Sequence, residues 1–304
     1  MRAAAILGIG TSPDDLKPFQ TAPSSMQLGV PVNADSLDAL LIFGGDGTIH
    51  RHLSDLVRLQ LPVLVVPRGS GNDFARSLGL PTLAQASAAW KRFTDDANNV
   101  RAVDLGVITP VDPSKERSRY FSCVAGVGLD TATARIANQL PRWLRGNGGY
   151  ALSLPVALAR FTPPQVDLRV DAQPHSSAPR VLAAFANTPW YGGGMCIAPR
   201  ADMADGLLDA CIIGAMSKAK LLRLFPSVYG GNHLQFKEVE YFQAARFELA
   251  AQPPVDVYAD GEFVCKTPVE IGVAKGSLRV IVPESASEGT GIPAPARVED
   301  DRAN

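Results

Sequence analysis

The sequence predicts two domains, an α/β domain with a parallel sheet followed by a β-sandwich-like domain. The chain has 304 residues, and at roughly 150 residues per domain two domains are expected. Its first third repeats strand, glycine-rich loop and helix, an order typical of a parallel sheet. After Tyr120, short β-rich stretches alternate with Gly and Pro turns, which is typical of a sandwich. We expect domains over residues 1–107 and 108–283, and a disordered tail over 284–304.

The first half alternates apolar runs with one amphipathic pattern. Ala3–Ile9 and Leu37–Phe43 are almost entirely apolar, as expected of parallel strands that are covered on both faces. Apolar residues then recur every three or four positions from Ile49 to Val57, which predicts one buried helix face. The segment Thr11–Asp35 is rich in Pro, Ser and Asp, and we expect a loop there. The remaining expected elements are strand Pro62–Val66, short helix Phe74–Leu78, helix Leu83–Phe93 and strand Val100–Val107.

The second half is expected to consist mostly of short strands with three helical interruptions. The expected strands are Tyr120–Val124, Val166–Val170, Val181–Asn187, Leu207–Ile213, Ala245–Leu249, Val255–Tyr258 and Leu278–Val282. The expected helices lie near Thr131–Leu140, Ala151–Phe161 and Ser217–Tyr229.

Composition excludes several classes of protein. A formal net charge of −1 argues against a nucleic-acid-binding protein, which usually carries a strongly basic domain. No run of 18 apolar residues occurs, so no helix is expected to span a bilayer. The four cysteines have neither the spacing of a zinc site nor that of a redox motif, which indicates reduced thiols. We therefore expect a cytoplasmic protein whose membrane contact, if any, is peripheral.

Two glycine-rich loops follow consecutive predicted strands. They are Gly44–Thr48 and Pro67–Asp73. Right-handed crossovers place both at the carboxyl edge of a parallel sheet, so we expect them to converge on one crevice. Glycines allow the backbone to approach a polyanion, and helix N-termini favour phosphate. The alternative is two tight strand-to-helix turns, each with a capping side chain.

The polar residues of these loops suit a nucleotide. Asp46 could act through Mg²⁺ or on a ribose hydroxyl, and Thr48 and Ser70 supply hydroxyl donors. With the stretch Pro67–Ala75, the first loop resembles the catalytic domain of the diacylglycerol kinase and sphingosine kinase superfamily, in its bacterial soluble branch. The first loop is shared with NAD kinases and phosphofructokinases, whereas the stretch from Gly69 to Ala75 is specific to lipid kinases. Further matching stretches are Val103–Gly106, Ala125–Asp130, Asn187–Gly194, Ala198-Pro199, Asp205–Asp209 and Asp260–Glu262.

This resemblance covers residues 38–283 and implies the fold, the cofactors and the site residues. It implies a NAD kinase/diacylglycerol kinase-like fold with an α/β nucleotide-binding domain and a β-sandwich domain, the active site lying between them. It implies ATP and Mg²⁺ as cofactors. It assigns nucleotide binding to Gly44, Gly45, Asp46, Gly47, Thr48, Gly69, Ser70, Asn72 and Asp73.

The catalytic residues implied by the resemblance are two acids. Glu262 matches the proton acceptor of the family, and a carboxylate near an alcohol can take its proton during phosphoryl transfer. Asp104 matches an acidic position near the cleft. The alternatives are an ordinary hairpin turn at Asp260-Gly261 and a strand-end aspartate at a turn.

A family Mg²⁺ site is matched by Asp202, Asp205 and Leu207. One carboxylate would be joined there by main-chain oxygens, a ligand set that hard cations favour. The alternative is a plain turn before a strand.

The sequence departs from the family pattern on the nucleotide side. Only about 35 residues separate the first predicted strand from Gly44, so an element is expected to be missing or shortened. His50-Arg51 stands where the family usually has Asn-Glu, and Arg51 or Arg68 could supply phosphate contacts. His50 and His52 are two apart and would point to different sides of the helix, so a solvated helix face is expected rather than a metal pair.

These inferences predict a lipid kinase that transfers the γ-phosphate of MgATP to the free hydroxyl of diacylglycerol or a related lipid, giving phosphatidic acid or its analogue. Two alternatives stay open: a kinase of a soluble acceptor, as NAD kinases are, and a nucleotide- or lipid-binding protein without catalysis. Trp143 with Arg142 and Arg145, and Trp190-Tyr191, could form an interfacial edge. The alternative for these tryptophans is half-buried packing against a loop.

Overall fold

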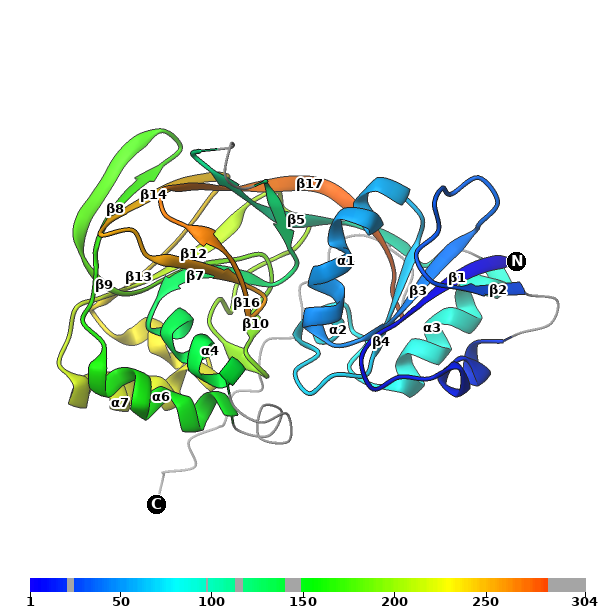
Figure 1. Ribbon diagram of the computed structural model, residues 1–304, viewed down its shortest axis with the longest axis horizontal. Coiled ribbons are helices and arrows are strands. Elements are labelled where there is room, and N and C mark those ends of the chain that lie inside the picture. The colour runs from blue at the N-terminus through cyan, green and yellow to red at the C-terminus, as the bar shows by residue number, and fades with distance from the viewer. Residues whose placement is uncertain (21–24, 97, 113–116, 140–148, 284–304) are drawn as a thin grey trace, which may run out of the picture.

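The computed structural model describes residues 1–20, 25–96, 98–112, 117–139 and 149–283. In this part of the chain an α/β half and a β-rich half lie side by side (Figure 1). Two long strands, β5 (Val100–Pro110) and β17 (Val269–Ile281), pair antiparallel and run through both halves. The predicted fold class is confirmed. The tail predicted over 284–304 lies outside the described residues.

The α/β half is built on parallel strands in the order β4-β3-β1-β2. All residues of β3 (Ala39–Gly44) and β4 (Val63–Pro67) are buried, which explains why both were recognisable as unbroken apolar runs. β1 (Arg2–Leu7) lies beside β3, and β2 (Ser25–Leu28) forms the edge. Near its end β17 pairs in parallel with β4, so a strand from the end of the described chain extends this sheet. The predicted domain boundary at residue 107 stays a prediction.

Three helices follow the strands of this half: α1 (Asp46–Leu59), α2 (Asp73–Ser77) and α3 (Leu83–Asp96). α1 begins two residues after β3 ends, and its Ile49, Leu53 and Leu56 are almost fully buried. The predicted helices are therefore confirmed. They could be predicted because the helical period of the apolar residues is visible within a short stretch of sequence.

The loop predicted over residues 11–35 is wrong in part. The segment forms a 3-10 helix, η1 (Pro13–Phe19), and the edge strand β2. Phe19 is fully buried and packs edge-on against Phe43, with ring centroids 5.2 Å apart. The indole Nε1 of Trp90 donates to the Phe19 carbonyl at 2.8 Å. Tertiary packing thus orders a segment whose Pro and Ser content is typical of loops.

The β-rich half packs two layers of strands around a second apolar core. Phe185 and Phe247 meet at its centre, with ring centroids 4.7 Å apart. The strands are β6 (Arg119–Phe121), β7 (Val124–Gly128), β8 (Gln165–Val170), β9 (Gln173–Ala186), β10 (Trp190–Tyr191), β11 (Met195–Cys196), β12 (Leu208–Gly214), β13 (Val239–Ala244), β14 (Arg246–Gln252), β15 (Asp256–Ala259) and β16 (Glu262–Lys266).

Six of the predicted strands of this half are confirmed, and β9 and β17 extend further than predicted. Tyr120–Val124 is not one strand, because β6 ends at Phe121 and β7 begins at Val124. β10, β11, β13 and β16 were not predicted. β13 and β16 are mostly half-buried or exposed, so they lack the apolar alternation by which a strand is recognised.

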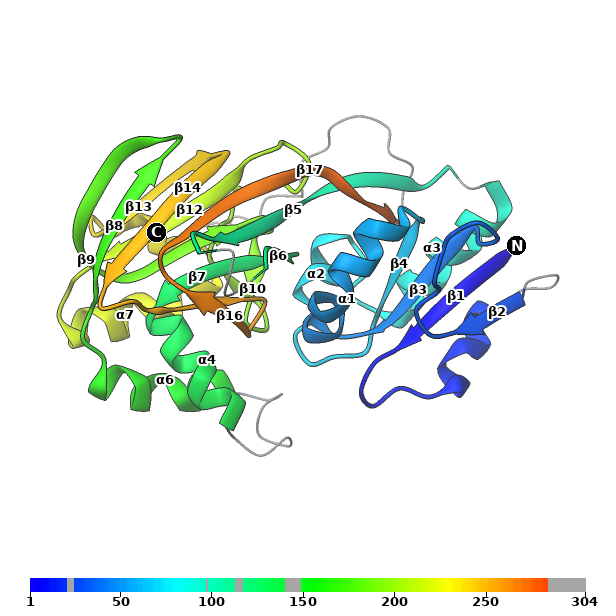
Figure 2. The same ribbon diagram turned by 45° about the horizontal axis from the view of Figure 1, so that its top comes forward.

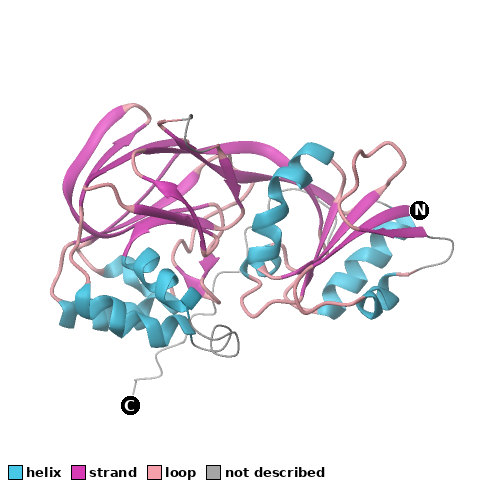
Figure 3. Cartoon of the chain, viewed as in Figure 1, coloured by secondary structure: helices cyan, strands magenta, loops and turns pink. Residues whose placement is uncertain are grey.

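Helices α4 (Leu129–Gln139), α6 (Gly149–Arg160) and α7 (Lys218–Tyr229) gather beneath the strands of the β-rich half (Figures 2 and 3). A second 3-10 helix, η2 (Asn232–Gln235), follows α7. Among the described residues, no helix is both long and apolar enough to cross a membrane.

Candidate active site

The two glycine loops are in direct contact. A Cβ atom placed on Gly45 would lie 2.8 Å from the Cα of Gly69, so only glycine fits at this crossing. The Arg68 N–H donates to the Gly44 carbonyl at 3.0 Å, which continues the pairing of β3 with β4 into the loops. The predicted convergence of the two loops is confirmed, and the reason is the parallel pairing of the strands that precede them.

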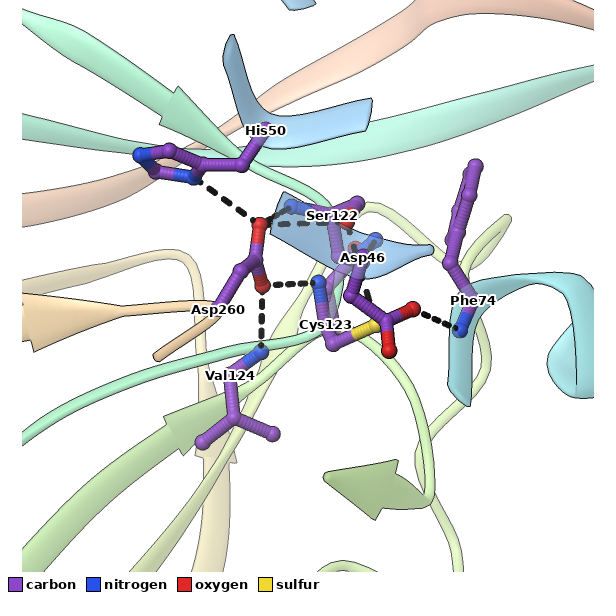
Figure 4. Close-up of polar contacts among 8 residues, drawn as sticks. Asp46, His50, Phe74, Ser122, Cys123, Val124 and Asp260 are labelled. Atoms are coloured by element: carbon purple, nitrogen blue, oxygen red, sulfur yellow. Dashed lines mark hydrogen bonds and ion pairs between the residues drawn. The ribbon is translucent and has the colours of Figure 1, made fainter. Parts of the chain in front are cut away.

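Asp46 connects the first loop to the second. Its Oδ2 accepts from the N–H of Asp73 and its Oδ1 from the N–H of Phe74, both at 3.1 Å (Figure 4). Burial, together with the negative charges of Asp73 and Asp260, raises the pKa of Asp46 to about 6, although the two N–H donors oppose the shift. A nearby cation would therefore stabilise the ionised form of Asp46.

Asp73 is the second carboxylate of the site and is 2% exposed. Its Oδ1 accepts from Arg76 and its Oδ2 from the N–H of Gly193, both at 2.8 Å. Burial raises its pKa despite these donors. The Oδ2 atoms of Asp46 and Asp73 lie 2.9 and 3.5 Å from the point that a Cβ on Gly71 would occupy. The two carboxylates therefore face the same small space.

Two residues predicted to bind nucleotide shape the loops instead of facing solvent. Asn72, with φ of 54°, accepts from the Gly69 N–H at 2.8 Å and donates to the Gly69 carbonyl at 2.7 Å. Thr48 is buried and its side chain fills the space beside Gly44 and Gly8, where added Cβ atoms would come within 2.6 Å of it. Ser70 is exposed at the surface of the second loop. Their contacts with a nucleotide stay predictions.

The two arginines considered for phosphate contacts lie apart from each other. Arg51 is exposed on α1, and Arg68 forms an ion pair with Asp15 of η1. A role for either in phosphate binding stays a prediction.

The turn Asp260–Glu262 joins β15 to β16 and is anchored by its first residue. Asp260 has a fully buried side chain and a φ of 51°. Its carboxylate accepts from the N–H groups of Ser122 and Cys123, both at 2.8 Å, from that of Val124 at 3.3 Å and from the Ser122 hydroxyl at 3.1 Å (Figure 4). Asp260 thus fixes the turn to the connection between β6 and β7.

Glu262 emerges from this turn towards the first glycine loop. It is exposed, and its Oε1 lies 3.2 Å from the point that a Cβ on Gly47 would occupy. Asp260–Glu262 can therefore be both an ordinary hairpin turn and the carrier of a base, because the turn brings Glu262 to the first glycine loop. The catalytic role of Glu262 stays a prediction.

His50 does not lie on a solvated helix face, and that prediction is wrong. Its side chain is 13% exposed and its Nδ1 is 3.1 Å from Oδ2 of Asp260. Burial lowers the pKa of His50, but the hydrogen bond and charge of Asp260, with the charge of Glu262, outweigh burial and raise it. One signal was available in the sequence: His50 is four residues after Asp46, on the same side of the helix.

Asp104 lies in the middle of β5 and is 4% exposed. Its Oδ2 accepts from the N–H of Gly206 at 2.7 Å and its Oδ1 from that of Gly276 at 2.6 Å. The Nδ2 of Asn187 donates to the carbonyls of Asp104 and Ser122 at 2.9 and 3.0 Å. Asp104 is therefore not at a strand end, since it lies within β5, and the alternative is wrong in this respect. Its carboxylate orders the turn before β12 and the break in the pairing of β17 with β5. A catalytic role for Asp104 stays a prediction.

The predicted metal ligands Asp202, Asp205 and Leu207 form a turn. Oδ1 of Asp202 accepts from the Ala204 N–H at 3.0 Å and pairs with Arg101 at 3.3 Å. Oδ1 of Asp205 accepts from the Leu207 N–H at 2.9 Å, and its Oδ2 accepts from Gln243. No cluster of three or more His, Cys, Asp or Glu side chains suited to a metal occurs in the described ranges. A metal at this turn stays a prediction.

An apolar cavity, which no motif in the sequence indicated, lies next to the site. It is partly open, and the space within it, including solvent at its mouth, is about 400 Å³. It is separated from Asp73 by the β10–β11 hairpin, whose tip, Gly192–Gly194, has positive φ at all three glycines. The lining side chains belong to Leu129, Asp130, Val181, Leu182, Tyr191, Met195, Ile197, Ile213, Leu221, Leu224, Phe225 and Val228.

Asp130 is the charged member of this lining. Burial raises its pKa to about 7, although the Thr131 N–H donates to its Oδ1 at 2.7 Å. Of the aromatic residues considered for an interfacial edge, Trp190 and Tyr191 are half-buried. Trp143, Arg142 and Arg145 lie outside the described residues.

Fold and site together define a class of protein, the two-domain kinases in which an α/β half with paired glycine loops adjoins a β sandwich. The chain matches the family model "Diacylglycerol kinase catalytic domain" over residues 15–108. It matches "YegS C-terminal NAD kinase beta sandwich-like domain" over residues 123–282. The chain belongs to the diacylglycerol kinase family of lipid kinases.

Individual relatives agree with this assignment. A diacylglycerol kinase of Mycobacterium tuberculosis is 35% identical over 256 residues, which are 82% of this chain and 78% of the relative. A diacylglycerol kinase of Bacillus subtilis is 28% identical over 83% of this chain and 80% of its own. The crystal structure of a diacylglycerol kinase from Bacillus anthracis shares the fold, with a TM-score of 0.65 at 19% identity over 92% of this chain and 96% of that one.

Proposed function

We propose that this protein transfers the γ-phosphate of MgATP to the free hydroxyl of diacylglycerol or a related lipid, giving phosphatidic acid or its analogue. One observation carries the proposal. The β10–β11 hairpin touches the carboxylate site on one side, where the Gly193 N–H binds Asp73, and lines the apolar cavity on the other with Tyr191 and Met195. A lipid with its chain in the cavity would have its polar end next to the glycine loops.

On the nucleotide side, the glycine loops are the proposed phosphate site. Gly45 and Gly47 are half-buried and Gly69 is exposed, so main chain without side chains lies near the surface at the point where α1 starts. The positive end of a helix and the absence of Cβ atoms together favour a polyphosphate. Asn72 supports this role by holding the second loop in shape.

The donor set of the site fits Mg²⁺ at two carboxylates. Mg²⁺ is usually bound by one or two carboxylates, waters and substrate phosphates, not by a full protein cage. Asp46 and Asp73 face one space, and their mutual repulsion contributes to the raised pKa of Asp46. When bound, Mg²⁺ would neutralise charge on the phosphates of ATP.

Glu262 is the proposed base. As the lipid oxygen bonds to the γ-phosphorus and the bond from phosphorus to the bridging oxygen of ADP breaks, the hydroxyl proton passes to the Glu262 carboxylate. The exposure of Glu262 beside Gly47 supports this role, since an acceptor can reach it. Asp104, in contrast, supports the site through turns of the main chain.

The acceptor side favours an apolar molecule. The pocket behind the β10–β11 hairpin is open to solvent on part of its surface, so an acceptor could enter it. Its walls are aliphatic and aromatic except for Asp130, so a hydrocarbon chain gains free energy by leaving water there. Such substrates reside in membranes, and we propose peripheral association of the protein with a membrane surface.

Phosphorylation of lipids in mixed micelles tests the proposal. The purified protein would be incubated with labelled ATP, Mg²⁺ and a panel containing a diacylglycerol, other lipid alcohols and soluble alcohols including NAD. We expect label in a lipid acceptor. Label only in a soluble acceptor would contradict lipid specificity, and ATP binding without any labelled product would indicate a protein without catalysis.

Three variants complete this test. Glu262→Gln should lower turnover by at least about 100-fold, since general acid–base catalysis contributes 10²–10⁴-fold. Asp46→Ala should lower turnover by a similar factor, because it removes one of the two proposed Mg²⁺ ligands. Glu270→Gln is the matched control, because Glu270 lies on β17 and pairs with Arg246. If Glu262→Gln were as active as the parent, the assignment of the base would be wrong.

A further inference from the structure

The start of α1 and the turn that carries Glu262 are joined by one side-chain contact. His50 Nδ1 and Asp260 Oδ2 are 3.1 Å apart. The other donors to Asp260 come from Ser122, Cys123 and Val124, at the connection between β6 and β7 (Figure 4). Among the described residues, His50 is the hydrogen-bond partner of Asp260 that comes from the α/β half.

The two ends of this contact belong to opposite sides of the reaction. Asp46, at the beginning of α1, is one helical turn before His50 and faces the same way. Glu262 is two residues after Asp260 and reaches the first glycine loop beside Gly47. A contact between His50 and Asp260 therefore constrains where the base stands relative to the nucleotide loop.

We infer that His50 is a positioning residue, which holds the turn Asp260–Glu262 against α1 and so sets the separation between Glu262 and the first glycine loop. The inference rests on the proposed function, because it concerns the base of that reaction. An error of about 1 Å in the placement of a reacting group can cost 10²-fold in rate. A buried anchor is needed here because Glu262 itself is exposed.

The charges around His50 favour its protonated form when the turn is in place. Asp260 from the turn and Glu262 from β16 attract the imidazolium, and Arg119 from β6 opposes it. β3 presents buried apolar residues to α1, and β17 meets α1 near its C-terminal end, where Gln60 donates to the Ser277 carbonyl. The contact is therefore a charge-assisted hydrogen bond at low pH and a neutral, weaker one above the raised pKa of His50.

Kinetics of His50 variants over about pH 5.5 to 9 test the inference. His50→Ala should lower kcat about 10- to 100-fold and change the KM for ATP by less than about threefold. His50→Asn keeps an N–H donor at a similar reach and should restore most of kcat. It should also lack the decline in kcat that accompanies deprotonation of His50 in the parent enzyme.

His52→Ala is the matched control on the same helix. His52 is 3.7 Å from Asp55 and is not part of the site, so kcat should be unchanged. Histidine NMR gives a readout that does not depend on activity. The chain has four histidines, so single substitutions assign the His50 resonance, which should titrate above its ordinary pKa of 6.5 and shift down in Glu262→Gln.

The outcomes separate this inference from the proposed function. If the parent enzyme phosphorylates lipid and His50→Ala is within twofold of it at every pH, the positioning role is wrong and the function stands. If the parent is inactive on every acceptor, the proposed function and the positioning role both fail, even though NMR can still report the contact. Loss of kcat in His50→Ala but not in His50→Asn, with the expected titration, supports the inference.

Discussion

The glycine-loop site and the apolar cavity lie on two sides of one hairpin and differ in the groups that form them. At the glycine loops, the main chain of one loop contacts the main chain of the other, and the Asp46 carboxylate connects them. At the cavity, mostly apolar side chains from α4, β9, β10, β11, β12 and α7 form the lining. Each region contains an aspartate with a raised pKa, yet Asp46 is surrounded by other acids whereas Asp130 is raised by burial alone. The glycine-loop site therefore suits charged ligands, and the cavity suits apolar ones.

The difference predicts that substitutions in the two regions have different effects on activity and stability. Main-chain contacts have no room to adjust, so changes at the glycine loops should abolish function. An apolar cavity can rearrange around a changed side chain, so changes there should alter affinity and stability by degrees. The following predictions test the contrast, beginning with the largest expected effect.

Gly45→Ala should abolish kinase activity, with a loss of more than about 100-fold. Its Cβ would lie 2.8 Å from the Cα of Gly69 and would force the loops apart. Gly272→Ala is the control, because its Cβ would have no neighbour closer than 3.6 Å. Kinetics and thermal unfolding of both variants are the measurement. An active Gly45→Ala would show that the loops are not in rigid contact.

Asp46→Asn should remove activity and should change how stability depends on pH. The pKa of Asp46 is raised from 3.8 to about 6, so its ionisation is less favourable in the folded than in the unfolded chain. The contribution of Asp46 to stability is thus fully present below the unfolded pKa of 3.8, and it is lost as the pH rises through the folded pKa of about 6. Removing the charge should make the variant more stable relative to the parent by about 1–2 kcal/mol as the pH rises from 5 to 8. Asn has one acceptor oxygen for the N–H groups of Asp73 and Phe74, so the loss of one hydrogen bond lowers its stability by a similar amount at both pH values.

Denaturant unfolding of the parent and of Asp46→Asn at pH 5 and pH 8 measures this difference. The gain should be smaller at pH 5, because the parent carboxyl is then largely protonated. The same difference in stability between variant and parent at pH 5 and pH 8 would contradict the raised pKa of Asp46.

Val228→Phe should raise the KM for a lipid acceptor about 10-fold and leave the KM for ATP within twofold. Val228 lines the cavity and is 4% exposed, so a larger side chain takes space that the proposed hydrocarbon chain needs. Val111→Phe is the control at an exposed position. An unchanged lipid KM, or an equal change in both KM values, would separate the cavity from acceptor binding.

Asp130→Asn should have the smallest effect on activity, and it should add about 2–4 kcal/mol of stability above pH 8. The pKa of Asp130 is raised to about 7, so the parent loses stability as the pH rises through that value. Asn keeps an acceptor for the Thr131 N–H and carries no charge. Melting temperatures of both proteins from about pH 5 to 9 should converge at low pH and separate at high pH.

Much of the α/β half could be predicted because its signals are local. β3 and β4 are unbroken apolar runs, and α1 repeats its apolar residues with the helical period. The segment 11–35 could not be predicted in the same way. Its order comes from Phe19, which packs against Phe43 and Trp90 far along the chain, and nothing in its own composition reports that packing.

The site divides similarly. The contact of Gly45 with Gly69 followed from strand order, because parallel strands that pair bring their carboxyl ends together. The contact of His50 with Asp260 spans 210 residues and has no period or motif that predicts it. The cavity is lined by residues between Leu129 and Val228. In the sequence, the apolar ones cannot be distinguished from residues of the hydrophobic core.

By itself the sequence determined the architecture of the two halves, the convergence of the glycine loops and the residues from which a phosphate site can be made. These depend on spacing along the chain and on backbone freedom, which are local properties. Only the tertiary structure decided that His50 is buried against Asp260, that Asp104 orders turns, and that an apolar cavity lies behind the hairpin. Burial and the meeting of distant side chains set those features, and both are properties of the packed chain.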